Sequence, residues 1–226
     1  MSERRRAVLA LAILLPAPSI GTWMGMVAAE GTTLGETFYV ASKAWVLLLP
    51  VLWLMVVDRK RPSVPRPSGR GMVAACVTGS LIFVLIGGAY LLFARSWIDV
   101  PHMREEVQEM DLGKLKYLGL VAYLITINSL LEEYVWRWFV VTRCEALLPR
   151  WWAVVASGLF FTLHHIIALW VYFDWRIIVL GSLGVCIGGM TWSWLYLRYR
   201  NIWAAYVSHV FADVVIFAIG YQLLFM

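Results

Sequence analysis

The sequence predicts an all-α fold, a polytopic bundle of about seven membrane-spanning helices. Of the 226 residues, 62% are hydrophobic and only 15% are charged, which is far from the balance of a soluble domain. Seven apolar runs have the roughly 20 residues that a helix needs to cross about 30 Å of hydrocarbon. The basic residues behind the net charge of +5 lie in the loops between these runs and form no aromatic-interleaved patch, so no nucleic-acid partner is expected.

The spans follow one another in a single membrane domain, residues 1–226. Arg4 to Arg6 and the apolar run after them resemble a signal peptide, but the run continues to Ala29 and is long enough to span a membrane. The polar segment 95–116 is expected to form either a short amphipathic surface helix at 103–110 or a solvated loop. The expected spans are residues 7–29, 37–57, 71–94, 117–141, 151–173, 176–197 and 202–224.

The orientation follows from the basic residues of the loops. With the N-terminus inside, twelve basic residues fall on the inner side and five on the outer side. The positive-inside rule therefore predicts a cytoplasmic N-terminus and, with seven spans, an external C-terminus. The basic N-terminus and short loops favour a multi-pass protein of a prokaryotic inner (plasma) membrane.

The fourth expected span contains three charged residues, Glu132, Glu133 and Arg137. A charge at mid-membrane costs several kcal/mol, so such residues are functional candidates by default. In a helix Glu133 and Arg137 are four residues apart and share a face, whereas Glu132 projects about 100° away. We expect Glu133 and Arg137 to form a buried ion pair that fixes the helix, and Glu132 to face a cavity. The alternative is that both glutamates only satisfy polar partners in the bundle.

Titratable residues also occur in the fifth and seventh spans. His164 and His165 are adjacent, so we expect only one of them to meet Glu132; His209 and Asp213 are four residues apart and share a face. At ~1.5 Å per residue, Glu132 lies about 16 Å from the inner end of its span, His164 about 20 Å, and His209 and Asp213 roughly 12 and 18 Å. These groups therefore fall at one level of the membrane.

The three sets of residues resemble the motifs of the CAAX-processing and bacteriocin-processing (CPBP) intramembrane proteases, which include the type II CAAX prenyl endopeptidases. The family motifs EExxxR, FxxxH and HxxxN/D read here as Glu132–Arg137, Phe160–His164 and His209–Asp213. The resemblance covers roughly residues 117–224, which it marks as the catalytic core. The three spans in 1–94 carry none of these motifs and are expected to be accessory.

The resemblance implies that Glu132 is a general base on a water molecule, assisted by His164, and that His209 with Asp213 steadies the oxyanion or binds a metal. Glu133, Arg137, Phe160 and His165 would be supporting residues. Phe161 with His165 also satisfies FxxxH, which leaves the choice of histidine open.

Asp213 replaces the asparagine of the eukaryotic CAAX enzymes. An ionised aspartate cannot donate a hydrogen bond, so Asp213 must be protonated, orient His209 or ligate a metal. Glu132, His164, His209 and Asp213 are zinc ligands by type but lack the compact HExxH spacing, so we expect no required cofactor and keep zinc as the alternative.

These features predict an intramembrane endopeptidase that cleaves a membrane-associated precursor, a leader segment or a C-terminal sorting segment. Its partners would be a membrane-anchored peptide or protein and the lipid bilayer. One rival is a non-catalytic peptide-binding or immunity-type protein of the same fold. The other is a proton-coupled transporter with a relay of titratable groups, which the lack of internal repeats disfavours.

Overall fold

The structure is a computed structural model that describes residues 1–61, 63, 65–109 and 111–226. Within these residues every regular element is a helix. Seven helical stretches are long and apolar enough to cross a membrane, which confirms the predicted all-α fold and the number of spans. The stretches are Glu3–Ala28, Thr33–Val57, Gly69–Leu92, Lys114–Glu145, Arg150–Tyr172, Trp175–Tyr199 and Ile202–Phe225.

Several spans are built from more than one helical element, because short π-helical turns continue the α-helices. A serine, threonine, aspartate or asparagine caps the N-terminus of each of the helices α1, α3, α4, α10 and α11. The side-chain oxygen of the cap accepts a hydrogen bond from a backbone N–H that has no partner in the first turn. The elements are α1 (Glu3–Leu14), α2 (Pro16–Trp23), η1 (Met24–Ala28), α3 (Thr33–Leu52), η2 (Trp53–Val57), α4 (Gly69–Leu92), η3 (Ala94–Ser96), α5 (Val100–Glu109), α6 (Lys114–Tyr123), η4 (Leu124–Asn128), α7 (Ser129–Glu133), η5 (Tyr134–Val141), α8 (Thr142–Glu145), α9 (Arg150–Tyr172), α10 (Trp175–Tyr199) and α11 (Ile202–Phe225).

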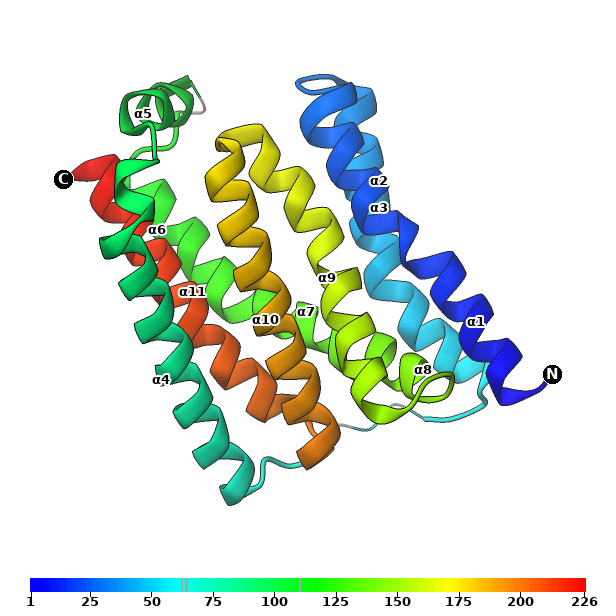
Figure 1. Ribbon diagram of the computed structural model, residues 1–226. Helices are drawn as coiled ribbons and strands as arrows, with labels where there is room; N and C mark the ends of the chain where they lie inside the picture. The colour runs from blue at the N-terminus through cyan, green and yellow to red at the C-terminus, as the bar shows by residue number, and fades with distance from the viewer. Residues whose placement is uncertain (62, 64, 110) are drawn as a thin grey trace.

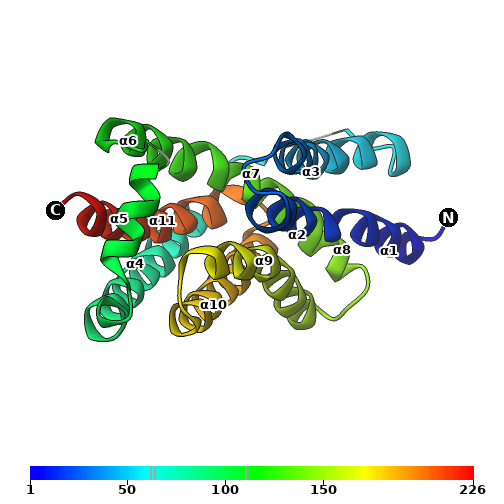
Figure 2. The same cartoon turned by 90° about the horizontal axis from the view of Figure 1, so that it is seen from above.

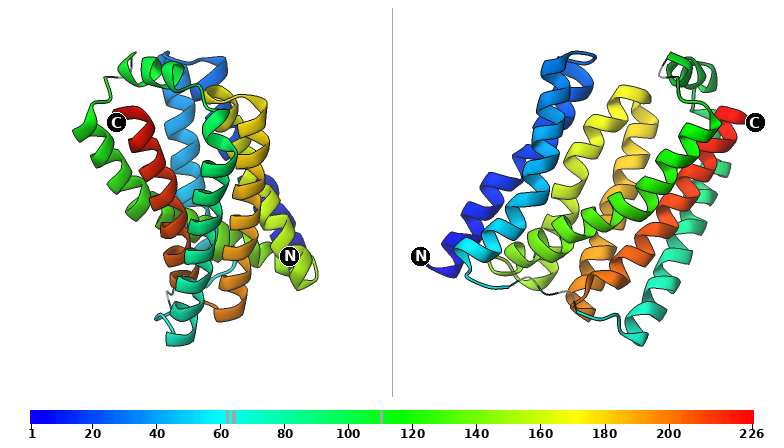
Figure 3. Two further views of the ribbon diagram at one scale, coloured as in Figure 1. Left: turned by 60° about the vertical axis from the view of Figure 1, so that its left-hand side comes forward. Right: turned by 180° about the vertical axis from the view of Figure 1, so that it is seen from behind.

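The fourth span, α6 to α8, is the longest and runs obliquely across the molecule behind α9, α10 and α11 (Figures 1 and 3). Its 32 residues exceed the roughly 20 that cross the hydrocarbon, so a tilt of this kind accommodates the excess length. Seen from above, α7 lies in the centre of the bundle (Figure 2). The tilted span thus carries its two glutamates into the middle of the protein.

Close helix pairs fix the spans that carry the histidines. Helix α9 packs along α10, and α4 packs along α11. A Cβ atom on Gly189 of α10 would lie 3.3 Å from the Cα of Gly158 on α9, so small residues allow these two helices to approach closely. The Ser193 hydroxyl donates to the Ser157 hydroxyl across the same interface, at 3.2 Å.

The polar segment between the third and fourth spans forms the surface helix α5, which lies across one end of the bundle beside α11 (Figures 1 and 2). Arg104 donates to the carbonyl of Leu223 at 2.9 Å and ties α5 to the last turns of α11. The surface-helix alternative is therefore confirmed for the described residues; Met110, the last residue of the expected helix, lies outside them.

Candidate active site

Glu132 and Glu133 lie in α7, a short α-helical segment between the π-helices η4 and η5. A π turn widens the helix and is frequent at functional sites. At the start of α7 the backbone N–H of Ser129 donates to the carbonyl of Leu124, five residues earlier. The two carboxylates end in different surroundings: the Glu132 side chain is 18% exposed, whereas that of Glu133 is fully buried.

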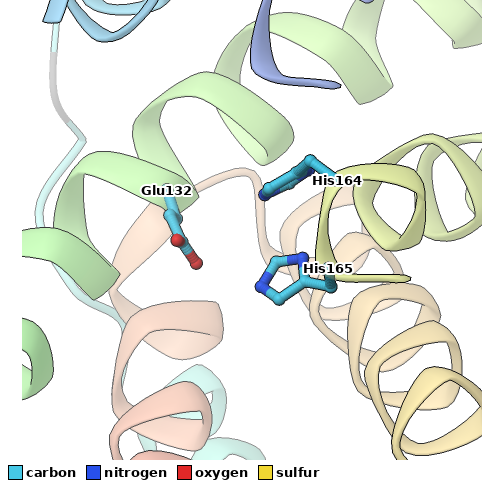
Figure 4. A group of neighbouring side chains, drawn as sticks. All are labelled: Glu132, His164 and His165. Atoms are coloured by element: carbon cyan, nitrogen blue, oxygen red, sulfur yellow. The ribbon is translucent and has the colours of Figure 1, made fainter. Parts of the chain in front are cut away.

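The Glu132 carboxylate points across a gap toward both histidines of α9 (Figure 4). One ligand atom of each of Glu132, His164 and His165 lies within 4.8 Å of the other two. The expectation that only one histidine would meet Glu132 is therefore wrong. Adjacent Cβ atoms diverge, but the two imidazole rings tilt together with their centroids 4.2 Å apart, so both reach the same space.

The two histidines differ in their partners. His165 Nδ1 lies 2.9 Å from the carbonyl oxygen of Phe161; because that oxygen can only accept, Nδ1 carries the proton. The His164 ring stacks parallel to Trp136, and its Nδ1 is buried without a hydrogen-bond partner among the described residues. Phe161 contacts both imidazole rings, whereas Phe160 is half-buried and packs against the main hydrophobic core. Phe161 is thus the phenylalanine that lines the site.

Glu133 joins two helices through a buried polar cluster. Arg137 Nε donates to one carboxylate oxygen at 3.1 Å, and His209 Nδ1 lies 2.9 Å from the other. The Arg137 guanidinium packs on the rings of Phe161 and Trp192 at 4.8 and 5.5 Å, while its Nη atoms have no hydrogen-bond partner among the described residues. The structure contains the Glu133–Arg137 pair and extends it to His209, a partner that sequence spacing does not reveal.

His209 and Asp213 complete the site from α11. The His209 ring stacks on Trp192 with centroids 3.8 Å apart. Its Nε2 lies 3.6 Å from Asp213 Oδ1 and 3.9 Å from Glu132 Oε2, so each ring nitrogen faces carboxylate oxygens. Asp213 Oδ2 accepts a short hydrogen bond from the Ser129 hydroxyl of α7. Glu132 of α7 and the two candidates of α11, His209 and Asp213, thus lie together where α7 contacts α11.

The residues with metal-binding geometry are only partly those expected. Among the described residues, the compact set is Glu132, His164 and His165. Two histidines and a glutamate form a ligand set found in catalytic zinc sites, and each of the three offers one ligand atom to the shared space. His209 and Asp213 lie beside this set, with His209 Nδ1 bonded to Glu133. The donor types thus fit a zinc ion.

A carboxylate facing imidazoles in the middle of a membrane-spanning bundle has the chemistry of an intramembrane hydrolase site. The comparison with protein families gives the same class. Residues 114–215, a little under half of the chain, match the family described as "Rce1-like: Type II CAAX prenyl endopeptidase Rce1-like". The match contains all three motifs and confirms the resemblance to this family of intramembrane proteases over the matched segment. Neither the curated proteins nor the solved structures gave a match.

Proposed function

We propose that this protein is an endopeptidase that hydrolyses a peptide bond of a membrane-associated precursor by means of a water molecule activated by Glu132. The observation that supports this proposal is the convergence of Glu132, His164 and His165 at mid-span. The Rce1-like match supplies the class, a protease acting in the bilayer on membrane-anchored proteins.

In the proposed mechanism Glu132 takes a proton from a water molecule held between its carboxylate and the imidazole of His164. The water oxygen attacks the scissile carbonyl carbon, and the carbonyl oxygen becomes an oxyanion. His209 in its protonated form can donate from Nε2 to that oxyanion, while its Nδ1–H donates to Glu133 and fixes the ring. Protonated Glu132 then gives its proton to the leaving amine as the carbon–nitrogen bond breaks, which returns the carboxylate.

We propose that this hydrolysis requires no cofactor, with zinc as the alternative. Glu132, His164 and His165 would hold the ion. A zinc ion supplies Lewis acidity, which polarises a carbonyl group and favours deprotonation of water. The side chains of His209 and Glu133 keep the same roles in either case, because neither belongs to the compact donor set.

The substrates that we propose are membrane-anchored precursors, leader segments or C-terminal sorting segments whose scissile bond reaches the level of Glu132. The expected setting is a prokaryotic plasma membrane with the N-terminus in the cytoplasm. Farnesylated CAAX proteins are not expected in such a membrane, so the substrate need not be prenylated.

Replacing Glu132 with glutamine tests the proposal, because an amide keeps the size of the side chain but cannot act as a base. Cells that carry Glu132→Gln should accumulate an uncleaved precursor in a quantitative membrane proteome, and purified enzyme should lose roughly 10²- to 10⁴-fold in rate. The control is Glu36→Gln, a like change at an exposed residue at the start of α3. Intact function in Glu132→Gln would instead favour a peptide-binding protein, and uptake driven by a pH gradient without proteolysis would favour a transporter.

A further inference from the structure

We propose that Asn128 and Ser129 are positioning residues that orient the two carboxylates of the site, Glu132 and Asp213. Asn128 ends η4 and Ser129 begins α7, and neither belongs to the three motifs. The inference rests on the proposed function, because it assigns the two carboxylates their catalytic geometry.

Asn128 holds one oxygen of Glu132. Its side-chain amide donates to Glu132 Oε1 at 2.9 Å, from one turn earlier in the same span. The other oxygen, Oε2, is the one that lies 3.9 Å from His209 Nε2. A neutral amide fixes the rotation of the carboxylate without forming an ion pair with it, whereas the neighbouring Glu133 is paired with Arg137. Glu132 is thereby oriented, and it forms no ion pair with an arginine or lysine of the described residues.

Ser129 of α7 forms a hydrogen bond with Asp213 of α11. Its side chain is buried, and its hydroxyl donates to Asp213 Oδ2. The Ser129 hydroxyl oxygen also lies 2.7 Å from the carbonyl oxygen of Leu124. A hydroxyl has one proton, so the Leu124 carbonyl and Asp213 Oδ2 share one donor. An asparagine at 213 would bring its own N–H groups, whereas an ionised aspartate has no donor and can only accept. Ser129 therefore supplies the donor that a carboxylate at this position needs.

Asn128 and Ser129 are adjacent in sequence but bond to different carboxylates, Glu132 and Asp213. Successive helical side chains diverge by about 100°, so Asn128 points along its own span while Ser129 faces α11. Thr126 offers a comparison within the same π turn. Its hydroxyl is exposed and donates to the carbonyl of Ala122 on its own helix, away from the site.

Infrared difference spectra of the purified full-length protein in detergent test both hydrogen bonds without requiring turnover. Asn128→Leu minus wild type should show a shifted carboxylate stretching band that disappears when the pair is compared in a Glu132→Gln background. Ser129→Ala should give a band that disappears in an Asp213→Asn background. Thr126→Val is the matched control and should leave the carboxylate region unchanged. Asn128→Ala serves as the second variant where leucine impairs folding.

A spectrum without a carboxylate shift, or a shift that persists in the Glu132→Gln or Asp213→Asn background, overturns the inference, because a packing role alone would alter only the amide bands. Turnover of an accumulated precursor is measured in parallel. We expect Asn128→Leu to lower kcat by roughly tenfold with KM within about twofold. Absence of turnover in the wild type contradicts the proposed function, whereas the infrared bands still decide the hydrogen bonds.

Discussion

His209 and Glu133 form a buried hydrogen bond, with 2.9 Å between His209 Nδ1 and Glu133 Oε1. This contact joins α11 to the fourth span and leaves the opposite nitrogen, Nε2, facing Asp213 and Glu132. Glu133 also accepts from Arg137, so one carboxylate fixes a guanidinium and an imidazole together. Glu133 thus serves to hold the site together, and Glu132 is left as the carboxylate that faces the histidines.

Glu133→Gln should therefore destabilise the protein strongly. Arg137 and His209 would lose the charge that compensates them in a fully buried position. Breaking one partner of a buried ion pair costs about 3–5 kcal/mol. The measurement is denaturant unfolding in detergent, followed by tryptophan fluorescence.

Glu145→Gln is the control, because Glu145 pairs with Arg200 at a partly exposed position. An exposed ion pair of this kind contributes about 0–1 kcal/mol. Glu132→Gln should also unfold close to the wild-type midpoint while losing activity. A stable, inactive Glu133→Gln together with an active Glu132→Gln would show that the two carboxylates have been assigned the wrong way round.

The spans and the depth of the site could be predicted because both depend on local chain properties. Apolar run length defines a span, and a rise of ~1.5 Å per residue fixes the depth of each polar group. The i, i+4 spacing likewise predicted the contact between Glu133 and Arg137, which the structure contains. These inferences need no knowledge of how the helices are arranged.

Contacts between spans could not be derived in this way. The bond between Glu133 and His209 joins residues 76 positions apart, and it depends on the tilt of the fourth span. The tilt of the two imidazole rings brought both His164 and His165 to Glu132, which a regular 100° step between neighbours does not predict. Asn128 and Ser129 carried no signal beyond being polar residues in an apolar run.

The close approach of α9 and α10 gives a second prediction. A Cβ atom on Gly158 would lie 3.1 Å from the backbone oxygen of Cys186 and 2.6 Å from the Met190 side chain. Gly158→Ala should therefore separate the helices, cost about 1–3 kcal/mol and move the histidines relative to Glu132. Unfolding midpoints and peptidase rates measure the two effects.

Gly184→Ala is the matched control on α10, because a Cβ atom there meets nothing within 4 Å. It should be neutral or slightly stabilising, since alanine favours helix by up to about 1 kcal/mol over glycine. Equal destabilisation by the two substitutions would show that the effect is a general one of glycine replacement and not of the α9–α10 contact.

The orientation of the chain gives a third prediction. Asp58 pairs with both Arg6 and Arg143, so the N-terminal end, the loop after η2 and the end of α8 share one side of the bundle. The positive-inside rule places this basic side in the cytoplasm. A phosphatase reporter fused after Met226 should therefore be active outside the membrane. A fluorescent protein that folds only in the cytoplasm should be dark when it is fused at the same position. Fluorescence of that fusion would place Met226 in the cytoplasm and contradict the predicted orientation.

The adjacent histidines give the last prediction and also test the role of metal. His164→Ala should lower kcat by roughly 10²- to 10⁴-fold, because the proposed mechanism holds the water between Glu132 and the His164 ring, one nitrogen of which lies near the Glu132 carboxylate. His165→Ala should cost less, since its Nδ1 is already bonded to Phe161. His102→Ala, at an exposed histidine of α5, is the control.

The same variants separate metal-free water activation from a zinc site. On the metal-free mechanism, dialysis against a chelator leaves the wild-type rate unchanged, and elemental analysis finds no stoichiometric zinc. A zinc site would behave differently, because both histidines belong to the compact donor set. His164→Ala and His165→Ala would then lose bound metal and activity to the same extent, and the chelator would inactivate the wild type. The metal-free mechanism is contradicted if the two variants lose metal and activity equally and added zinc restores the activity of the dialysed wild type. The ion would then be assigned to Glu132, His164 and His165.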